Sequence, residues 1–309
     1  MDQNNEEKLK QFAEEKEGRV GPPITPIPGG ANPIPMAQSR DPQNELGWER
    51  LKITDLPTQG LFYPEGTEIV IRSATAGEIR HWSTLNEDDI FALDDMLNYV
   101  LERCCSLKFP DGKFSSWRDI KEVDRFYIIL AIRERTFVKG DNKLQAKVSE
   151  TEKIDIVKDM VDYITFDDRV MRFYSPEERC IILPFKNSGK KVRVFLPSAG
   201  VTNWLKNYIN RKRQAGEPLD EDFVGYAPFV IGDWRGLNDS SYEKFVLDSN
   251  SWSAEEYSVL TEVKKIFSET INPVLKYKDK NGGERVIPLN FQGGIKSIFL
   301  ISDPFSKLG

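Results

Sequence analysis

The stretch "DRFYIILAIRERTF", from Asp124 to Phe137, is the segment that decides the fold of this 309-residue chain. Residues 126–132 are apolar on nearly every side of a helical wheel, and a helix that is apolar all round is buried in a core. The sequence therefore predicts a buried central helix here. Ser116-x-x-Asp119, a capping signal just before it, is expected to open that helix.

The chain before the central helix carries signals for one strand and two further helices. Residues 67–72 predict a strand, and Thr75-x-x-Glu78 is a capping box that predicts a short helix after it. A longer helix is expected from about Asp88, because acidic residues favour the positive end of a helix dipole and apolar residues then recur every three or four positions. Those apolar positions are Ile90, Leu93, Leu97, Leu101 and Cys104.

The second half of the chain is richer in strand signals. "CIILPF" and "KKVRVFLP" predict a hairpin that turns at residues 187–189, and "VLKYKDKNGGERVIPLNF" predicts another that turns at residues 281–283. Helices are expected over residues 198–213 and from Ser253-x-x-Glu256 onward. Helices and short antiparallel hairpins mixed in this way indicate an α+β fold and not a doubly wound parallel sheet.

Residues 217–236, "EPLDEDFVGYAPFVIGDWRG", are predicted to be rich in loops, and this region is unusually aromatic. Aromatic loops often pack on a partner protein, and the alternative is that they cover the chain's own core. Both interpretations stay open at this point for Phe223, Tyr226, Phe229, Trp234, Tyr242 and Trp252.

These signals divide the chain into three parts. Residues 1–45 are predicted to be a charged and proline-rich extended arm. Residues 46–175 are predicted to form a subdomain of strand and helices, and residues 176–309 a hairpin-rich α+β subdomain.

The arm contains seven of the chain's eighteen prolines. Proline fixes φ and removes a backbone donor, so polyproline-like extension is expected there. Apolar residues are interleaved with the prolines, and a stiff segment loses little entropy when it docks in a groove of a neighbouring subunit. A solvated linker is the alternative. The arm residues predicted to contact a partner are Ile24, Ile27, Ile34 and Met36.

A rigid turn, "LPTQGLFYPEG" over residues 56–66, precedes the first predicted strand. Its prolines and glycines preset the backbone, so side chains on it reach a partner at little conformational cost. The sequence therefore predicts that Leu61, Phe62 and Tyr63 contact a partner protein.

Composition excludes several classes of function. The net charge of −6, with acidic and basic residues interspersed, argues against general binding of nucleic acid or of an anionic membrane. No stretch approaches the ~20 apolar residues of a membrane span, and the polar N-terminus is unlike a signal peptide. The protein is therefore expected in a cytosol or in a particle assembled there. The three cysteines are expected to be buried thiols.

The search for reactive groups yields no predicted catalytic, cofactor-binding or metal-binding residue. His81 is the only histidine, and it lies far in sequence from any distinctive serine or cysteine context. The neighbouring Cys104 and Cys105 lack the spacing of a zinc site. "GGIKS", at residues 293–297, lacks the glycine-lysine spacing of a phosphate-binding loop. A small-molecule substrate is not expected.

Four blocks of the sequence resemble the baseplate hub family of T-even-type contractile-tailed bacteriophages. "DRFYIILAIRERTF" is similar to the central apolar helix of that family, "PFKNSGKKVRVFLPSAG" to its later hairpin and "IPLNFQGGIKSIFLISDPFSKLG" to its apolar tail. "LPTQGLFYPEGTEIVIRSATAGEI" resembles the start of the family's fold. The matching positions in that block are Leu56, Pro57, Gly60, Tyr63, the strand to Arg72, Thr75 and Glu78.

The resemblance implies a structural protein of the virion, located in the tail baseplate and assembled in the host cytoplasm. Its partners would be other baseplate or tail proteins, and the family supplies no catalytic residues. Two departures limit the comparison: the proline-rich arm is an addition, and a Cys-x-x-Cys pair found in many relatives is missing after the central helix, so no zinc site is carried over. A tail or hub assembly chaperone that leaves the finished virion is the main alternative. An enzyme that uses His81 is a third.

Overall fold

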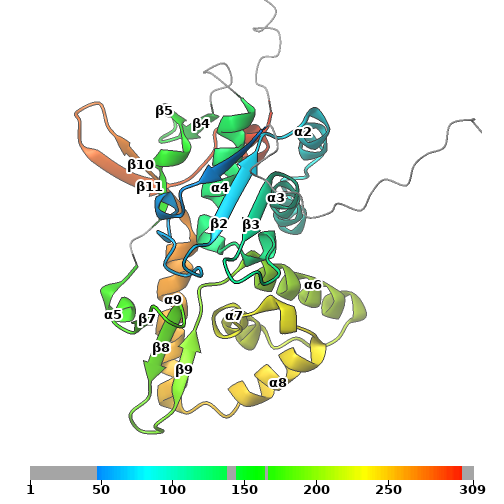
Figure 1. Cartoon of the computed structure of the whole chain (residues 1–309), viewed down its shortest axis with the longest axis vertical. Helices are drawn as coiled ribbons and strands as arrows, with labels where there is room; N and C mark the ends of the chain where they lie inside the picture. Colours follow the sequence, from blue (N-terminus) through cyan, green and yellow to red (C-terminus); the bar gives the residue numbers. More distant parts are fainter. Residues whose placement is uncertain (1–46, 138–143, 164–165, 301–309) are drawn as a thin grey trace, which may run out of the picture. The chain divides into compact units, whose positions relative to one another are not determined.

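The computed structural model describes residues 47–137, 144–163 and 166–300 (Figure 1). Within them it contains eight α-helices and four small antiparallel sheets, so the predicted α+β class is confirmed. The predicted arm, with Ile24, Ile27, Ile34 and Met36, lies outside the described residues. None of the described helices is both long enough and apolar enough to cross a membrane.

Helix α4, Glu122–Thr136, is the buried central helix that the sequence predicts. Every residue from Tyr127 to Arg133 is buried, so the helix is covered on all sides. The prediction of its start is wrong, because Ser116 and Asp119 cap a separate 3-10 helix, η2 (Trp117–Asp119). The chain is then extended at Lys121, which forms an antiparallel bridge with Ser198, and this pairing delays the start of α4.

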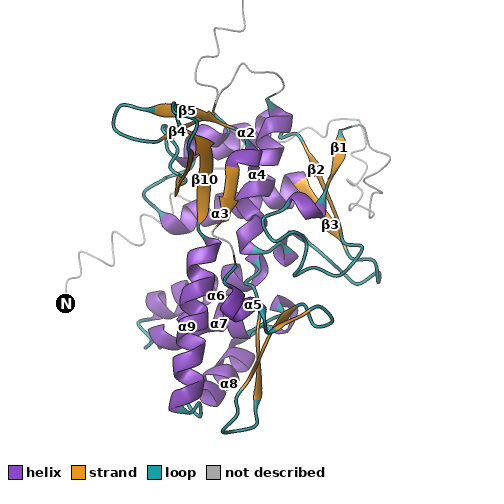
Figure 2. Cartoon of the chain, turned by 90° about the vertical axis from the view of Figure 1, so that its left-hand side faces the viewer, coloured by secondary structure: helices purple, strands orange, loops and turns teal. Residues whose placement is uncertain are grey.

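An antiparallel sheet in the order β1-β2-β3 packs against α4 (Figures 1 and 2). Ile69 and Ile71 of its central strand are buried, and the predicted Thr75–Glu78 capping box is present at the start of α2. Helix α3 runs directly into β3, which buries both Cys104 and Cys105 as predicted. The elements are β1 (Trp48–Leu51), β2 (Glu68–Arg72), α2 (Ala76–Ser83), α3 (Ile90–Cys104) and β3 (Cys105–Lys108).

A second group of elements surrounds the first predicted hairpin, which is confirmed as β8 and β9. Helix α6 begins at the N-cap Ser198, and it ends at Gly216, whose φ of +68° is the left-handed conformation that glycine tolerates. The Ser253–Glu256 capping box opens α9 as predicted. The elements are α5 (Asp168–Met171), β7 (Tyr174–Ser175), β8 (Cys180–Pro184), β9 (Lys191–Val194), α6 (Ala199–Ala215) and α9 (Ala254–Ile271).

The aromatic region after α6 is helical, so the prediction of loops there is wrong. Helix α7 (Glu221–Val230) includes Pro228 in its last turn, and α8 (Asp239–Ser249) follows. Asp220 and Asn238 are the N-caps of these helices. The six aromatic side chains named above are buried or pack against the chain's own core, so they do not form an exposed partner surface.

The C-terminal hairpin, β10 and β11, is confirmed with its predicted turn, and it returns to the first half of the chain. Strand β10 pairs with β6, and Phe291 forms a bridge with Ala146 of β4. Leu275 and Phe299 belong to the same apolar cluster as α4. The predicted boundary at residue 175 is therefore crossed by strand pairing and core packing. The elements are β4 (Leu144–Lys147), β5 (Lys153–Ile156), β6 (Val161–Tyr163), β10 (Pro273–Lys278) and β11 (Glu284–Pro288).

Candidate interaction site

The rigid turn of residues 56–66 is fastened to α4 by a buried carboxylate. The backbone N–H of Thr58 donates to Asp124 Oδ1 at 3.0 Å, and the Thr58 hydroxyl donates to Oδ2 at 2.8 Å. The Tyr63 hydroxyl donates to Oδ2 at 2.7 Å and accepts a hydrogen bond from the backbone N–H of Lys121 at 2.9 Å. Asp124 is completely buried, so these bonds replace the water that its carboxylate has lost.

The backbone conformation of the turn explains why a glycine occupies position 60. Gln59 and Gly60 both have positive φ, +52° and +79°, and the Gln59 N–H donates to the Leu56 carbonyl at 2.7 Å. A Cβ at Gly60 would lie 3.2 Å from Ile53, so the position combines a left-handed backbone with a close neighbour. The sequence prediction that this segment is rigid agrees with these contacts.

The prediction that Phe62 and Tyr63 contact a partner is wrong. Each side chain is only 3% exposed. Phe62 packs against the rings of Phe166 and Tyr174, and Tyr63 belongs to the central apolar cluster. The turn is rigid because these two aromatic side chains anchor it to the chain's own core. Leu61 is 39% exposed, and it is the member of the predicted trio that the fold leaves accessible.

Burial dominates the acid–base behaviour of the anchor. It raises the pKa of Asp124 from 3.8 to about 6, although the hydrogen bonds from Thr58 and Tyr63 act in the opposite direction. Burial, together with the neighbouring Asp124, also raises the pKa of Tyr63 well above 10.0. Tyr63 therefore remains a protonated donor at neutral pH.

A charged junction joins α3 and α4 to α6. Arg125 donates to the side chain of Asp94 and, at 2.8 Å, to Asn98 Oδ1, while Lys206 of α6 donates to Asp94 Oδ2 at 2.9 Å. Asn98 also donates to Asn203 Oδ1 at 3.2 Å. Burial by itself would raise the pKa of Asp94, but the charges of Arg125 and Lys206 hold it below its usual value.

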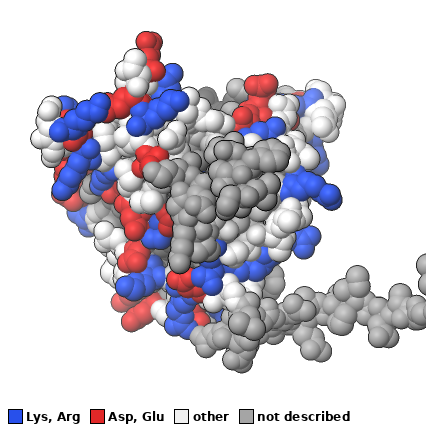
Figure 3. Space-filling view, turned by 90° about the horizontal axis from the view of Figure 1, so that it is seen from above, with Lys and Arg blue, Asp and Glu red and all other residues white. Residues whose placement is uncertain are grey.

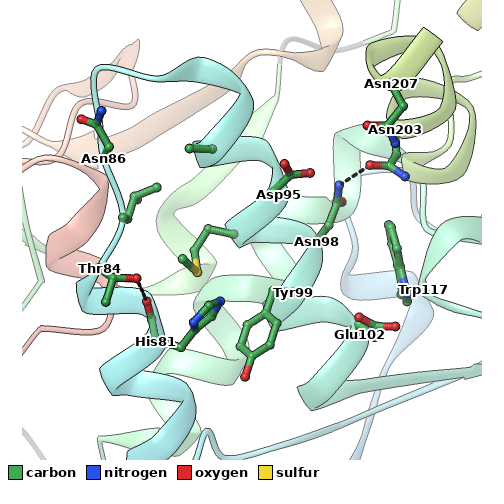
Figure 4. Close-up of a pocket in the computed structure, with 13 residues that line it drawn as sticks. His81, Thr84, Asn86, Asp95, Asn98, Tyr99, Glu102, Trp117, Asn203 and Asn207 are labelled. Carbon is green, nitrogen blue, oxygen red and sulfur yellow. Dashed lines mark hydrogen bonds between the residues drawn. The ribbon is translucent and has the colours of Figure 1, made fainter. Parts of the chain in front are cut away.

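A pocket of about 640 Å³ opens beside this junction (Figure 4). Figure 4 shows Asn98 and Asn203 meeting at one side of it and the rings of His81 and Tyr99 lying together at the other, with centroids 4.3 Å apart. Its labelled side chains are His81, Thr84, Asn86, Asp95, Asn98, Tyr99, Glu102, Trp117, Asn203 and Asn207.

The pocket offers amides, carboxylates and aromatic rings, which suit hydrogen bonding to a polar segment of another molecule. The one hydroxyl of a serine or threonine that lines it, that of Thr84, donates to the His81 backbone carbonyl at 2.7 Å. His81 therefore has no activated serine or cysteine beside it in this pocket. No group of three or more His, Cys, Asp or Glu side chains in the described part of the chain could hold a metal ion.

The surface around the top of the molecule carries charges of both signs, and basic and acidic side chains alternate over the face in Figure 3. This distribution is what the near balance of 43 basic and 49 acidic residues predicts. The described side chains that are visible on this face form no large patch of a single sign.

Sequence reasoning missed the two polar groups that organise the interior, Asp124 and Asn98. A signal for the first was present, because Asp124 and Arg125 lead into an otherwise apolar helix and buried charges require partners. The partners themselves, Thr58 and Asp94, lie 66 and 31 residues away, so no local pattern identifies them. No family model, curated protein or solved structure matches the chain.

Proposed function

We propose that this chain is a structural subunit of the baseplate of a contractile phage tail, in its hub or wedge. It holds neighbouring tail proteins in place and carries out no covalent chemistry. It is assembled in the host cytoplasm and stays in the virion. The proposal rests on the resemblance of four blocks to the baseplate hub family, and three of these blocks lie together around the N-terminal end of α4.

The first block contributes Thr58 and Tyr63, whose hydroxyls bind Asp124 in the second block. In the third block, the carbonyl of Pro197 accepts a hydrogen bond from the Glu122 N–H at 3.0 Å, and the Ala199 N–H donates to the Ile120 carbonyl at 2.8 Å. Ile120 and Glu122 lie just before the second block. Blocks far apart in sequence thus depend on one another in space.

The fourth block joins the same core at another point. Phe299 packs edge-on against Trp82, with ring centroids 4.9 Å apart, and the Trp82 indole N–H donates to the Lys296 carbonyl at 3.0 Å. Its position supports a fold that spans all four blocks. A rigid frame of this kind presents Leu61 and the pocket of Figure 4 in fixed positions, which lowers the entropy cost of binding a partner.

The proposal is tested by deleting residues 1–45 from the chain in the phage that encodes it. We expect the truncated chain to remain folded and monomeric, with an unchanged thermal unfolding curve, and to enter baseplates poorly because the docking arm is gone. Normal incorporation of a folded truncated chain would contradict the arm's role.

Quantitative mass spectrometry of purified particles separates the subunit from an assembly chaperone. A subunit is present in a fixed ratio to other baseplate proteins, whereas a chaperone is required for assembly but absent from the particle. The enzyme alternative predicts that His81→Ala abolishes infectivity although the variant folds and is incorporated normally. Unchanged infectivity of this variant would remove that alternative.

A further inference from the structure

The pocket of Figure 4 combines an apolar floor with a polar rim. Leu85 and Met96, which line it, are only 3% and 8% exposed, so their apolar surfaces lie at its base. The rings of Tyr99 and Trp117 are partly buried and add to this apolar surface. The volume of about 640 Å³ is within the ~300–1,000 Å³ found for ligand pockets, so the pocket has room for a small ligand.

The rim is built from one face of α3 and one face of α6. Side chains three or four residues apart lie on the same face of a helix. Asn203 and Asn207 have this spacing on α6, and the Asn98 side chain donates to Asn203 Oδ1 at 3.2 Å, which joins the two faces (Figure 4). The side chains of α3 that bring polar groups to the pocket are Asp95, Asn98, Tyr99 and Glu102.

Several polar groups of the rim are available to a ligand. Glu102 and Asn207 are exposed, and neither side chain makes a hydrogen bond or an ion pair within the described residues. Asn203 accepts from Asn98, but its own amide N–H groups have no acceptor in the part of the chain that the structure describes. Two amides and a carboxylate can therefore bond to a bound molecule without breaking a contact of the chain.

The charges of the rim disfavour an anionic ligand. Its two carboxylates are that of Asp95, which accepts from Lys206, and that of the unpaired Glu102. No lysine or arginine is among the described residues that line the pocket, so a phosphate or carboxylate would be repelled without a compensating cation. The amides each present donors and an acceptor, and a hydroxyl group also donates and accepts. The rim therefore suits a ligand with several neutral hydroxyl groups.

A saccharide has this combination of groups. A pyranose ring has an apolar face of C–H groups and hydroxyls around its edge, so the ring covers an apolar floor while its edge bonds to a polar rim. We propose that this pocket binds a neutral saccharide, whose ring lies on the apolar floor and whose hydroxyls bond to Asn203, Asn207 and Glu102. The inference goes beyond the proposed function, and binding can be measured on the isolated chain whether or not the chain is a baseplate protein.

The first experiment is saturation-transfer difference NMR with the full-length chain and three neutral probes, added separately: maltotriose, lactose and tri-N-acetylchitotriose. Saturable binding of at least one of them is expected. Trigalacturonic acid, whose pyranose rings each carry a carboxylate, is the acidic probe, and it should bind at least tenfold more weakly than the best neutral probe because Glu102 repels it. Absence of saturation with all three neutral probes at millimolar concentration, or equal binding of the acidic probe, would overturn the proposal.

Two variants and two matched controls locate the site. Asn207→Ala and Glu102→Ala are each expected to weaken binding of the best neutral probe about fivefold to tenfold, because each removes hydrogen bonds to the ligand. Asn290→Ala and Glu284→Ala remove the same groups from exposed positions outside the pocket, and they should leave binding unchanged.

The melting temperature of the free chain shows whether the two pocket variants remain folded. Neither Glu102 nor Asn207 bonds to another described residue, so both variants should melt with the unsubstituted chain. Unchanged binding by both folded pocket variants, or an equal loss in the pocket variants and their controls, would refute the assignment of the saccharide to this pocket.

Discussion

Replacing Tyr63 by phenylalanine is the sharpest probe of the anchor that holds the opening turn. The ring stays and its packing in the central cluster is retained, but the hydroxyl is lost. That hydroxyl donates to Asp124 Oδ2 at 2.7 Å and accepts from the Lys121 N–H at 2.9 Å. The substitution therefore changes two hydrogen bonds and little else.

The expected magnitude follows from these two bonds. A hydrogen bond to a charged group contributes about 1.5–3 kcal/mol, and a buried N–H left without an acceptor costs about 1–3 kcal/mol. Asp124 keeps its bonds from Thr58, so part of the loss is offset. We expect Tyr63→Phe to lower the free energy of unfolding by about 2–4 kcal/mol, a large fraction of the ~5–15 kcal/mol typical of a folded protein.

The assay is equilibrium unfolding in urea at pH 7, and the matched control is Tyr242→Phe. Both tyrosines are 3% exposed, and both lose the same atom, but the Tyr242 hydroxyl has no hydrogen-bond partner in the described residues. The control should therefore stabilise the chain or leave its stability unchanged. If the two variants lose the same free energy, the loss reflects ring repacking, and the idea that Asp124 anchors the turn through Tyr63 is wrong.

Two further predictions concern Asp124 and the packing at Gly200. Asp124 has a pKa of about 6 in the folded chain and 3.8 in the unfolded chain, so the folded chain binds its proton more tightly. The stability gained from this tighter proton binding is fully present below pH 3.8 and is lost as the pH rises through 6. The loss is about 3 kcal/mol. Urea unfolding between pH 4 and 8 should show this loss of stability in the unmodified chain but not in Asp124→Asn, and parallel pH profiles of the two chains would contradict the raised pKa of Asp124. Gly200→Ala would place a Cβ 2.5 Å from the Trp234 ring and 2.8 Å from Arg118 Cβ, so it should destabilise the chain by about 1–3 kcal/mol. Gly77→Ala, whose Cβ would meet nothing closer than 3.9 Å near the start of α2, should instead stabilise the chain by about 0.5–1 kcal/mol, and similar thermal shifts for both alanines would disprove the clash.

Local signals in the sequence predicted local structure well. The Thr75–Glu78 and Ser253–Glu256 capping boxes both form, and the turn around Gly282 closes the predicted hairpin. Each of these features is decided by residues within a few positions of one another. The same holds for the central helix, since its all-round apolar pattern needs no knowledge of what covers it.

Predictions that depended on distant contacts failed. Ser116 and Asp119 form the expected cap, but Lys121 pairs with Ser198 and interrupts the helix that the cap was expected to open. Residues 217–236 were predicted to be rich in loops, yet Asp220 caps α7 and Pro228 lies inside that helix.

The candidate site shows the same limit. Phe62 and Tyr63 lie in a turn whose sequence predicts exposure. Their role as anchors follows only from the packing of Phe62 on Phe166 and from the hydrogen bond of Tyr63 to Asp124. The pocket of Figure 4 is lined by residues from α2, α3, α6 and the 3-10 helix η2, so no single stretch of sequence predicts it.

The most direct test of the central claim is a cryo-electron microscopy map of the intact tail at side-chain resolution, from the phage that encodes the chain. The account predicts density for this chain in the baseplate, in contact with neighbouring tail proteins, with residues 19–36 seated against another subunit. A baseplate that is complete without this chain, or one in which that segment projects into solvent from every copy, would contradict the account.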